Sequence, residues 1–384
     1  MRRKMYSIAA LCIALAASST ILTSCEDDED KTTTEVSGEL ENGSTISGDI
    51  TSNTTLAEGY EYKLSGGVHV KEGATLTIKP GVKITAIDDD TPDYILIEQG
   101  AKIDAQGTAS NPIVMTSETP ENKWGGIHIC GKAHTNAESG SGSSEIGGAK
   151  YGGSDDKDNS GTLRYIRLEY TGFALDEEHE ANGISFYGVG SGTTVDHIES
   201  YKGGDDGFEF FGGSVNVNNM VSFDSSDDSF DWTEGWNGSA TNILAYQMSA
   251  EDDCLIEADN NGKNYDAIPV SRPTIKNAIL IGNGGDGRGI RLRAGTQVIL
   301  DNVVACGKNM PLTVETGQTE TALKNGDATI TNTTISANLN SKESIYTNED
   351  FIKEPTNNID ATGITIEAAK GLNSWLNESW IVLE

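Results

Sequence analysis

The sequence predicts an all-β fold, a solenoid in which short parallel strands coil around one long core. The main observation is a pair of adjacent aspartates that recurs in the same setting, at Asp205, Asp227 and Asp252, with steps of 22 and 25 residues. A turn followed by a short strand at such a period is typical of a solenoid. The composition agrees, because 44 glycines suit many turns and no long amphipathic helical pattern is present. Since each coil packs only on its neighbours, a chain of this length needs no second core.

Residues 1–24 are predicted to be an export signal and not part of the fold. A basic start is followed by the apolar run from Ile8 to Ala17, which is too short to span a membrane. The segment Leu22–Cys25 resembles a bacterial lipobox, which implies that Cys25 is acylated and becomes the mature N-terminus. The alternative is an ordinary signal peptide with a chance cysteine.

Residues 25–44 are predicted to be a lipidated acidic tether. The run from Glu26 to Asp30 is typical of a solvated segment, and its position directly after Cys25 also resembles the surface-export signal of Bacteroidota-type lipoproteins. The resemblance implies a protein held by acyl chains on the outer face of the outer membrane, where a transporter complex is a candidate partner. The net charge of −32 argues against nucleic acid as a partner.

The solenoid is predicted to cover residues 45–345. Short alternating stretches such as Ala74–Ile78 are separated by glycine-rich turns, which is the pattern of short strands. Two polar insertions, His134–Gly161 and Asn260–Pro273, interrupt the repeat, and insertions of this kind often overhang the binding face.

The last segment, residues 346–384, is predicted to cap the solenoid. The periodicity fades there, and the open end of a stack of strands must be covered. Trp375 and Trp380 are the side chains expected to close it.

A second set of residues that recurs once per coil supports the repeat. Five coils place an asparagine at the same position of a strand-like stretch, which predicts stacked amides that hydrogen-bond from coil to coil inside a turn. His197 occupies the same position in an earlier coil and is therefore expected to be a turn residue and not a catalyst. The asparagines are Asn219, Asn242, Asn277, Asn302 and Asn332.

The aspartate pairs are candidate cation ligands. Alternation in the strand that follows points Phe208 and Phe230 inward and Glu209 and Asp231 outward. Acids stacked about 4.8 Å apart repel one another unless water, protons or a cation relieve the charge, and calcium suits clustered oxygens. The alternative is turn formation, since aspartate hydrogen-bonds its own backbone. The expected calcium ligands are Asp205, Asp206, Asp227, Asp228, Asp252 and Asp253.

Asp156 and Asp158 form a separate candidate. They match the first half of a calcium-binding loop, but Arg167 stands where the bidentate glutamate is expected. The alternative is a solvated turn.

The outward acids lie beside aromatic residues in the sequence, which predicts a sugar site. Rings stack on the apolar face of a pyranose, and acids bind its hydroxyl groups. Arginines near the last acidic copy either neutralise the stack, which is the plainer account, or clamp a carboxylate such as a uronic acid. The expected ligand-binding residues are Glu209, Asp231, Trp232, Trp236, Glu257, Arg288, Arg291 and Arg293.

Residues 45–345 resemble the right-handed parallel β-helix, or pectate-lyase-like, superfamily, and within it surface lipoproteins of the Bacteroidota type. The segments that carry the resemblance are Trp124–Ile127, Tyr151–Gly153, Ser160–Tyr165, Gly203–Gly213 and Ser226–Asp228. It implies a single-stranded right-handed parallel β-helix with N- and C-terminal caps, and it implies no particular activity.

The polygalacturonases are the enzymes with the nearest motif, but the match is incomplete. Asp252-Asp253-Cys254 mimics one motif, whereas Asp286 stands where that family has a histidine, and Arg291-Leu292-Arg293 replaces its last motif poorly. The expected function is therefore binding of glycan, calcium or both on an acidic face, as part of nutrient capture. The alternatives are a polysaccharide lyase or glycoside hydrolase and a passive adhesin or coat protein.

Overall fold

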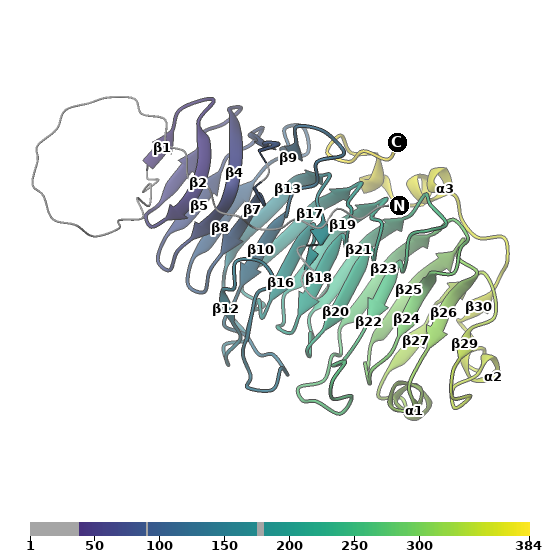
Figure 1. Cartoon of the computed structure of the whole chain (residues 1–384). Coiled ribbons are helices and arrows are strands. Elements are labelled where there is room, and N and C mark those ends of the chain that lie inside the picture. The colour runs from purple at the N-terminus through teal and green to yellow at the C-terminus, as the bar shows by residue number, and fades with distance from the viewer. Residues whose placement is uncertain (1–37, 90, 175–179) are drawn as a thin grey trace, which may run out of the picture.

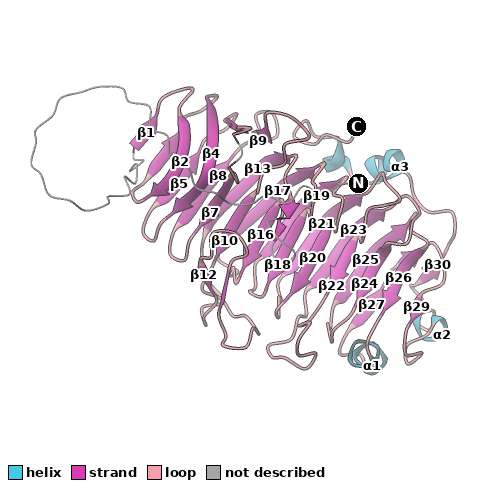
Figure 2. Cartoon of the chain, in the orientation of Figure 1, coloured by secondary structure: helices cyan, strands magenta, loops and turns pink. Residues whose placement is uncertain are grey.

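The computed structural model describes residues 38–89, 91–174 and 180–384, and these form one long parallel β-helix (Figure 1). The predicted signal, Cys25 and most of the tether lie outside these residues. Strands dominate and helices are few and short (Figure 2). Within the described ranges, no helix combines the length and apolar character that a membrane crossing requires.

The strands stack in three rows, which we call faces 1, 2 and 3. Face 3, which carries the acidic repeats, is built from strands paired in parallel and in register. Its strands are β2 (Thr45–Ile50), β4 (Glu61–Val70), β7 (Tyr94–Ile97), β10 (Ile127–Cys130), β16 (Ile184–Tyr187), β18 (Phe208–Phe211), β20 (Phe230–Thr233), β22 (Ile256–Ala258), β24 (Arg288–Leu292), β26 (Met310–Val314) and β29 (Asn340–Ser341).

Faces 1 and 2 share six long strands that bend from one face to the other. The long strands are β13 (Gly161–Glu169), β17 (Thr194–Tyr201), β19 (Asn216–Phe223), β21 (Ser239–Tyr246), β23 (Thr274–Ile281) and β25 (Ile299–Cys306). Face 1 also has β1 (Gly38–Leu40), β3 (Thr54–Leu56), β5 (Thr75–Ile78), β8 (Lys102–Gln106) and β27 (Thr329–Thr331). Face 2 also has β6 (Lys83–Ala86), β9 (Ile113–Ser117), β28 (Thr334–Ile335) and β30 (Asn358–Ile359). The first parts of β2 and β4 belong to face 2 as well, because both strands bend from face 2 into face 3.

The remaining elements lie outside the three faces. The first hairpin pairs β11 (Gly142–Ser143) with β12 (Lys150–Tyr151), and the second pairs β14 (Phe173–Ala174) with β15 (Glu180–Ala181). The helices are α1 (Gly317–Asn325), α2 (Asn348–Phe351), α3 (Ile366–Leu372) and the single 3₁₀ turn Ser374–Asn377.

The predicted asparagine ladder is confirmed at the bend between faces 1 and 2. Asn219, Asn242, Asn277 and Asn302 all have φ between 52° and 60°, a left-handed conformation that asparagine tolerates better than most residues. Asn242, Asn277 and Asn302 each donate to the side-chain carbonyl oxygen of the asparagine one coil before, at 2.8 to 3.1 Å. The two end members differ, because Asn219 donates to Asp196 Oδ1 and Asn332 donates to Asp301 Oδ1. His197 has φ 60° at the same position, so its predicted turn role is also confirmed.

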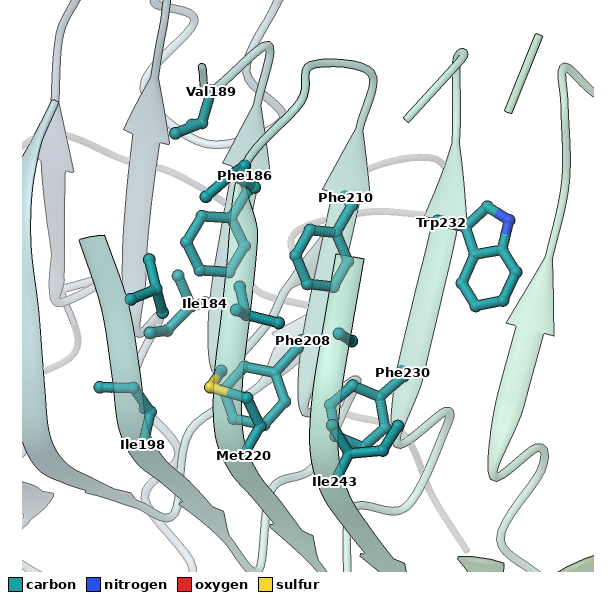
Figure 3. Packing of buried hydrophobic residues seen from close by; sticks show 14 of the residues in the cluster. Ile184, Phe186, Val189, Ile198, Phe208, Phe210, Met220, Phe230, Trp232 and Ile243 are labelled. Atoms are coloured by element: carbon teal, nitrogen blue, oxygen red, sulfur yellow. The ribbon is translucent and has the colours of Figure 1, made fainter. Parts of the chain in front are cut away.

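The core is a stack of apolar side chains inside the coil. Phe186 lies parallel to Phe210 at a centroid distance of 5.0 Å, and Phe208 lies on Phe230 at 5.2 Å. Figure 3 shows these rings pointing inward from successive strands of face 3. Because the strands of one face are about 4.8 Å apart, identical positions in successive coils bring rings into stacking distance.

The prediction that Trp375 and Trp380 close the open end is wrong. Tyr346 and Phe351 are buried in the main core at that end. Trp380 lies instead on face 2, with its ring 5.4 Å from that of His197. The physical reason is a row of outward apolar residues on face 2, including the stacked pair Tyr201 and Phe223, which the returning tail helps to bury.

Candidate functional site

The predicted column of outward acids is present on face 3. Glu209 in β18 is in register with Asp231 in β20, and Asp231 is in register with Glu257 in β22. The flanking residues Phe208 and Phe230 are buried, as alternation requires. The aspartate pairs lie in the turns that lead from face 2 into these strands. The repeat therefore gathers acids from the turns and from the strands on one strip of the surface.

The acids of this strip form three groups, which we together call the acidic band. Within each group one candidate ligand atom from every residue lies within 4.8 Å of the others. The first group is Glu180, Asp205 and Asp227; the second is Asp206, Glu209 and Asp231; the third is Asp228, Asp253, Cys254 and Glu257.

The second aspartate of a pair also has a structural role. Asp206 Oδ1 accepts a hydrogen bond from the backbone N–H of Asp228 at 2.9 Å, and Asp228 Oδ1 accepts one from the N–H of Cys254 at 2.6 Å. Each carboxylate thus holds the turn of the next coil through one oxygen. The turn role and a ligand role are compatible, because a carboxylate has two oxygens.

Among the described residues, the ion pairs of the band lie at its Glu257 end. Arg291 Nη1 donates to Glu257 Oε1 at 2.7 Å, and Arg293 binds Glu257 and Asp259. This arrangement agrees with neutralisation, the plainer role expected for these arginines. Within the described residues no ion pair reaches the second group, and Asp231 Oδ1 is buried without a hydrogen-bond partner.

The pKa values of the carboxyl groups in the acidic band show that their ionised forms are unfavourable. Burial, followed by the charge of Asp228, raises the pKa of Asp206 well above its usual value. Burial, followed by the charge of Glu257, does the same to the pKa of Asp231. Burial together with Glu180 and Asp227 raises the pKa of Asp205 to about 8. At neutral pH the band therefore binds protons, or it needs another cation to remain ionised.

Several predicted ligands lie outside the three groups. Asp252 Oδ2 accepts from the N–H of Ser249 at 3.0 Å and is not part of the third group. Asp156 Oδ1 pairs with His134 Nδ1 at 2.7 Å, and Asp158 Oδ2 accepts from Ser160 Oγ at 3.3 Å. Asp156 thus contacts a residue 22 positions earlier in the chain, whereas the contact of Asp158 with Ser160 is local.

Arg288 is also separate from the band. Its Nη1 donates to the carbonyl oxygen of Asp286 at 3.4 Å, and its Nε is buried without a partner among the described residues.

The predicted aromatic platform is wrong. Trp232 and Trp236 are both 0% exposed and belong to the main core. Trp236 lies on Phe210 at a centroid distance of 4.0 Å, and Trp232 Nε1 donates to Thr296 Oγ1 at 3.1 Å. Trp232 follows Phe230 by two residues, so alternation turns both rings into the core, as Figure 3 shows for these two residues.

Two residues of the site were not predicted. Glu180 reaches Asp205 and Asp227 from the hairpin of β14 and β15, and no local motif marks it. Cys254 is expected from the sequence as a buried free thiol and not as part of the site; its buried thiol lies 3.8 Å from Glu257 Oε1. Burial, followed by the charge of Asp228, raises the pKa of this thiol, so it remains protonated.

Comparison with known proteins gives one match. Residues 48–381 match a family model described as a pectate-lyase like beta helix domain. No curated protein and no solved structure matches the chain. The match covers the coils, the acidic band and most of the returning tail.

Proposed function

Since this chain belongs to the pectate-lyase-like β-helix family, which accounts for its fold, we propose that it is a surface-anchored binding protein that takes up calcium on the acidic band. Two ligands, glycan and calcium, are expected for this face, and the clustered acids support calcium. The sugar platform has no such support, because the two tryptophans expected to form it lie in the core.

The observation that carries the proposal is the second group of the band. Asp206, Glu209 and Asp231 each offer an oxygen within 4.8 Å of the others. Calcium binds oxygens at about 2.3–2.6 Å, so two ligands on opposite sides of one ion lie about 5 Å apart. The buried, unpartnered Asp231 Oδ1 supports a cation at this position, since an unsatisfied buried carboxylate oxygen is costly.

The surface location rests on the sequence. The lipobox-like Leu22–Cys25 and the acidic run that follows support acylation of Cys25 and export to the outer face of the outer membrane. A transporter that imports captured nutrients would be the natural partner there. Incorporation of radiolabelled palmitate, lost in Cys25→Ser, tests the anchor; equal labelling of wild type and variant would refute it.

Calorimetry tests the calcium site. The purified protein, stripped with EDTA and dialysed, is titrated with calcium chloride. We expect saturable binding that Asp231→Asn weakens by about tenfold or more. Asp155→Asn, in a turn outside the acidic band, is the matched control and should bind as wild type does. No binding to wild type, or equal binding to Asp231→Asn, contradicts the proposal.

The same protein distinguishes an enzyme from a binder. Incubation with polygalacturonate and calcium would yield unsaturated products that absorb ultraviolet light from a lyase, and new reducing ends from a hydrolase. A binder yields neither. Either activity, if abolished in Asp231→Asn, would replace the binding proposal with a catalytic one.

A further inference from the structure

We infer that a groove at the corner between faces 3 and 1 is a second ligand site, which binds a neutral oligosaccharide. The groove has a volume of about 590 Å³. One wall is the loop between β22 and β23, and the other is formed by α1 and Ile345 (Figure 1). The acidic band and the lining of the groove share no residue, so the assignment does not depend on calcium.

The loop wall is held in place by one buried side chain. Asn260 is fully buried, and its Nδ2 donates to the carbonyl oxygens of Tyr265 at 3.1 Å and Ala267 at 3.0 Å. Its Oδ1 accepts from the N–H of Ser271 at 2.8 Å and from Asn136 Nδ2 at 2.9 Å. Because these bonds fix the backbone, the groove exists before a ligand arrives.

The helix wall is held by a second set of buried polar residues. Thr319 Oγ1 accepts from the N–H of Gly295 at 2.9 Å, which fastens α1 to the neighbouring coil. Glu320 is fully buried and accepts from the N–H groups of Glu343 at 2.7 Å and Ile345 at 2.6 Å. These bonds place the side chain of Ile345 at the mouth of the groove.

Exposed apolar side chains concentrate at this groove. Of the seven large hydrophobic residues that are exposed in the described ranges, three line it: Tyr265 at 40%, Ile268 at 83% and Ile345 at 37%. Apolar groups left in water beside a preformed hollow indicate a surface that a ligand covers. A tyrosine ring at such a place suits the apolar face of a pyranose.

The polar lining selects the class of ligand. Gln297, Gln318 and Thr321 both donate and accept hydrogen bonds, and Asp266 and Asp327 accept them. The described lining contains two carboxylates and no lysine or arginine, which disfavours an anionic ligand. Arg272 lies outside the lining and donates from Nε to the carbonyl oxygen of Asp327 at 2.9 Å. Amides and carboxylates beside an exposed ring match the alternating hydroxyl groups and apolar faces of an uncharged sugar chain.

Glycan-array screening followed by titration calorimetry tests the inference. The probes are cello-, manno- and xylo-oligosaccharides, with oligogalacturonates as the anionic comparison, each with calcium and with EDTA. We expect a neutral series to bind equally in both conditions. Tyr265→Ala should weaken that binding about tenfold, because it removes the ring and keeps the backbone carbonyl that Asn260 holds. Gln318→Ala, on the other wall, should also weaken it.

Tyr60→Ala is the matched control, because Tyr60 is 38% exposed on a distant N-terminal turn, and it should bind as wild type does. Asp231→Asn should also keep the sugar affinity, which separates this site from the calcium site. The inference is overturned if no neutral oligosaccharide binds, if only oligogalacturonates bind, or if Tyr265→Ala and Gln318→Ala both bind as tightly as wild type.

Discussion

Asp231 is buried beside other acids, which is unfavourable for stability, and the same position suits a bound cation. It stacks between Glu209 and Glu257, and one of its oxygens is buried without a hydrogen-bond partner in the described part of the chain. Alternation in the strand was enough to predict that Glu209 and Asp231 face outward. Alternation with Phe230 places Trp232 in the core, and nearness to the acids in sequence does not override it. Trp236 lies beyond the end of β20, so strand alternation does not predict its burial. Glu180 could not be predicted, since it joins the band only through a hairpin pairing.

Replacing Asp231 with asparagine should stabilise the calcium-free protein. The substitution removes a buried carboxyl group that must either stay ionised beside other acids or take up a proton on folding, so we expect the free energy of unfolding in EDTA at pH 8 to rise by about 1 kcal/mol. Urea unfolding followed by circular dichroism measures it. In excess calcium the order should reverse, because only wild type keeps the full site. A variant less stable than wild type in EDTA would show that the carboxylate is structural.

Replacing Trp232 with alanine should destabilise the core and leave calcium affinity unchanged. A buried tryptophan truncated to alanine costs roughly 3–5 kcal/mol, and Trp232→Phe should cost less because a ring remains. Urea unfolding and calcium titration of both variants provide the comparison. Unchanged stability would mean that the side chain is not buried as described.

At the scale of elements, the corners of the coil differ in their roles. The bend between faces 1 and 2 carries the ladder from Asn219 to Asn302, which one shared frame in the sequence was enough to predict. The corner between faces 3 and 1 carries the long insertions, and these were predicted from their polar composition. The path of the tail could not be predicted, because the repeat fades before it and its binding surface on face 2 lies far away in sequence.

A substitution within the ladder separates backbone strain from amide bonding. Asn242→Ala loses two amide hydrogen bonds and forces alanine to adopt φ 57°, so we expect a loss of roughly 2–3 kcal/mol of unfolding free energy. Asn242→Gly loses the same bonds without the steric cost and should be about 1 kcal/mol more stable than the alanine variant. Equal stability of the two variants in urea would exclude backbone strain as a contribution.

At the scale of the whole molecule, the repeat period predicted one solenoid core, and the structure and the family match agree with it. The groove was beyond prediction because its walls, the loop after β22 and α1, are separated in the sequence by two coils. Tyr265 and Gln318 line the same groove only because the coils stack on one another.

The net charge of −32 and the buried acids make the free energy of unfolding of the whole molecule depend on pH. Asp205 has a pKa of about 8 when folded and about 3.8 when unfolded, because of burial, Glu180 and Asp227. Between these values the folded state binds more protons, so stability without calcium falls as pH rises. Asp93, whose pKa burial raises to about 7, contributes with the same sign.

Thermal unfolding in EDTA should therefore show a lower Tm at pH 8 than at pH 6.5. Buried His128, whose pKa is lowered to about 4, contributes with the opposite sign, but unfolded histidine is already half deprotonated at pH 6.5, so this contribution is the smaller one. Calcium should raise the Tm more at pH 8 than at pH 6.5, because protons no longer compete for the band. A Tm in EDTA that rises with pH across this window would contradict the raised pKa values.

We propose that a calcium ion lies between Asp206, Glu209 and Asp231 in the acidic band. The most direct measurement is a crystal structure of the protein grown in calcium chloride, with anomalous diffraction data. We predict an anomalous peak with oxygens of all three residues at about 2.3–2.6 Å. Absence of a peak there, or a peak only at Asp156 and Asp158, would contradict the account.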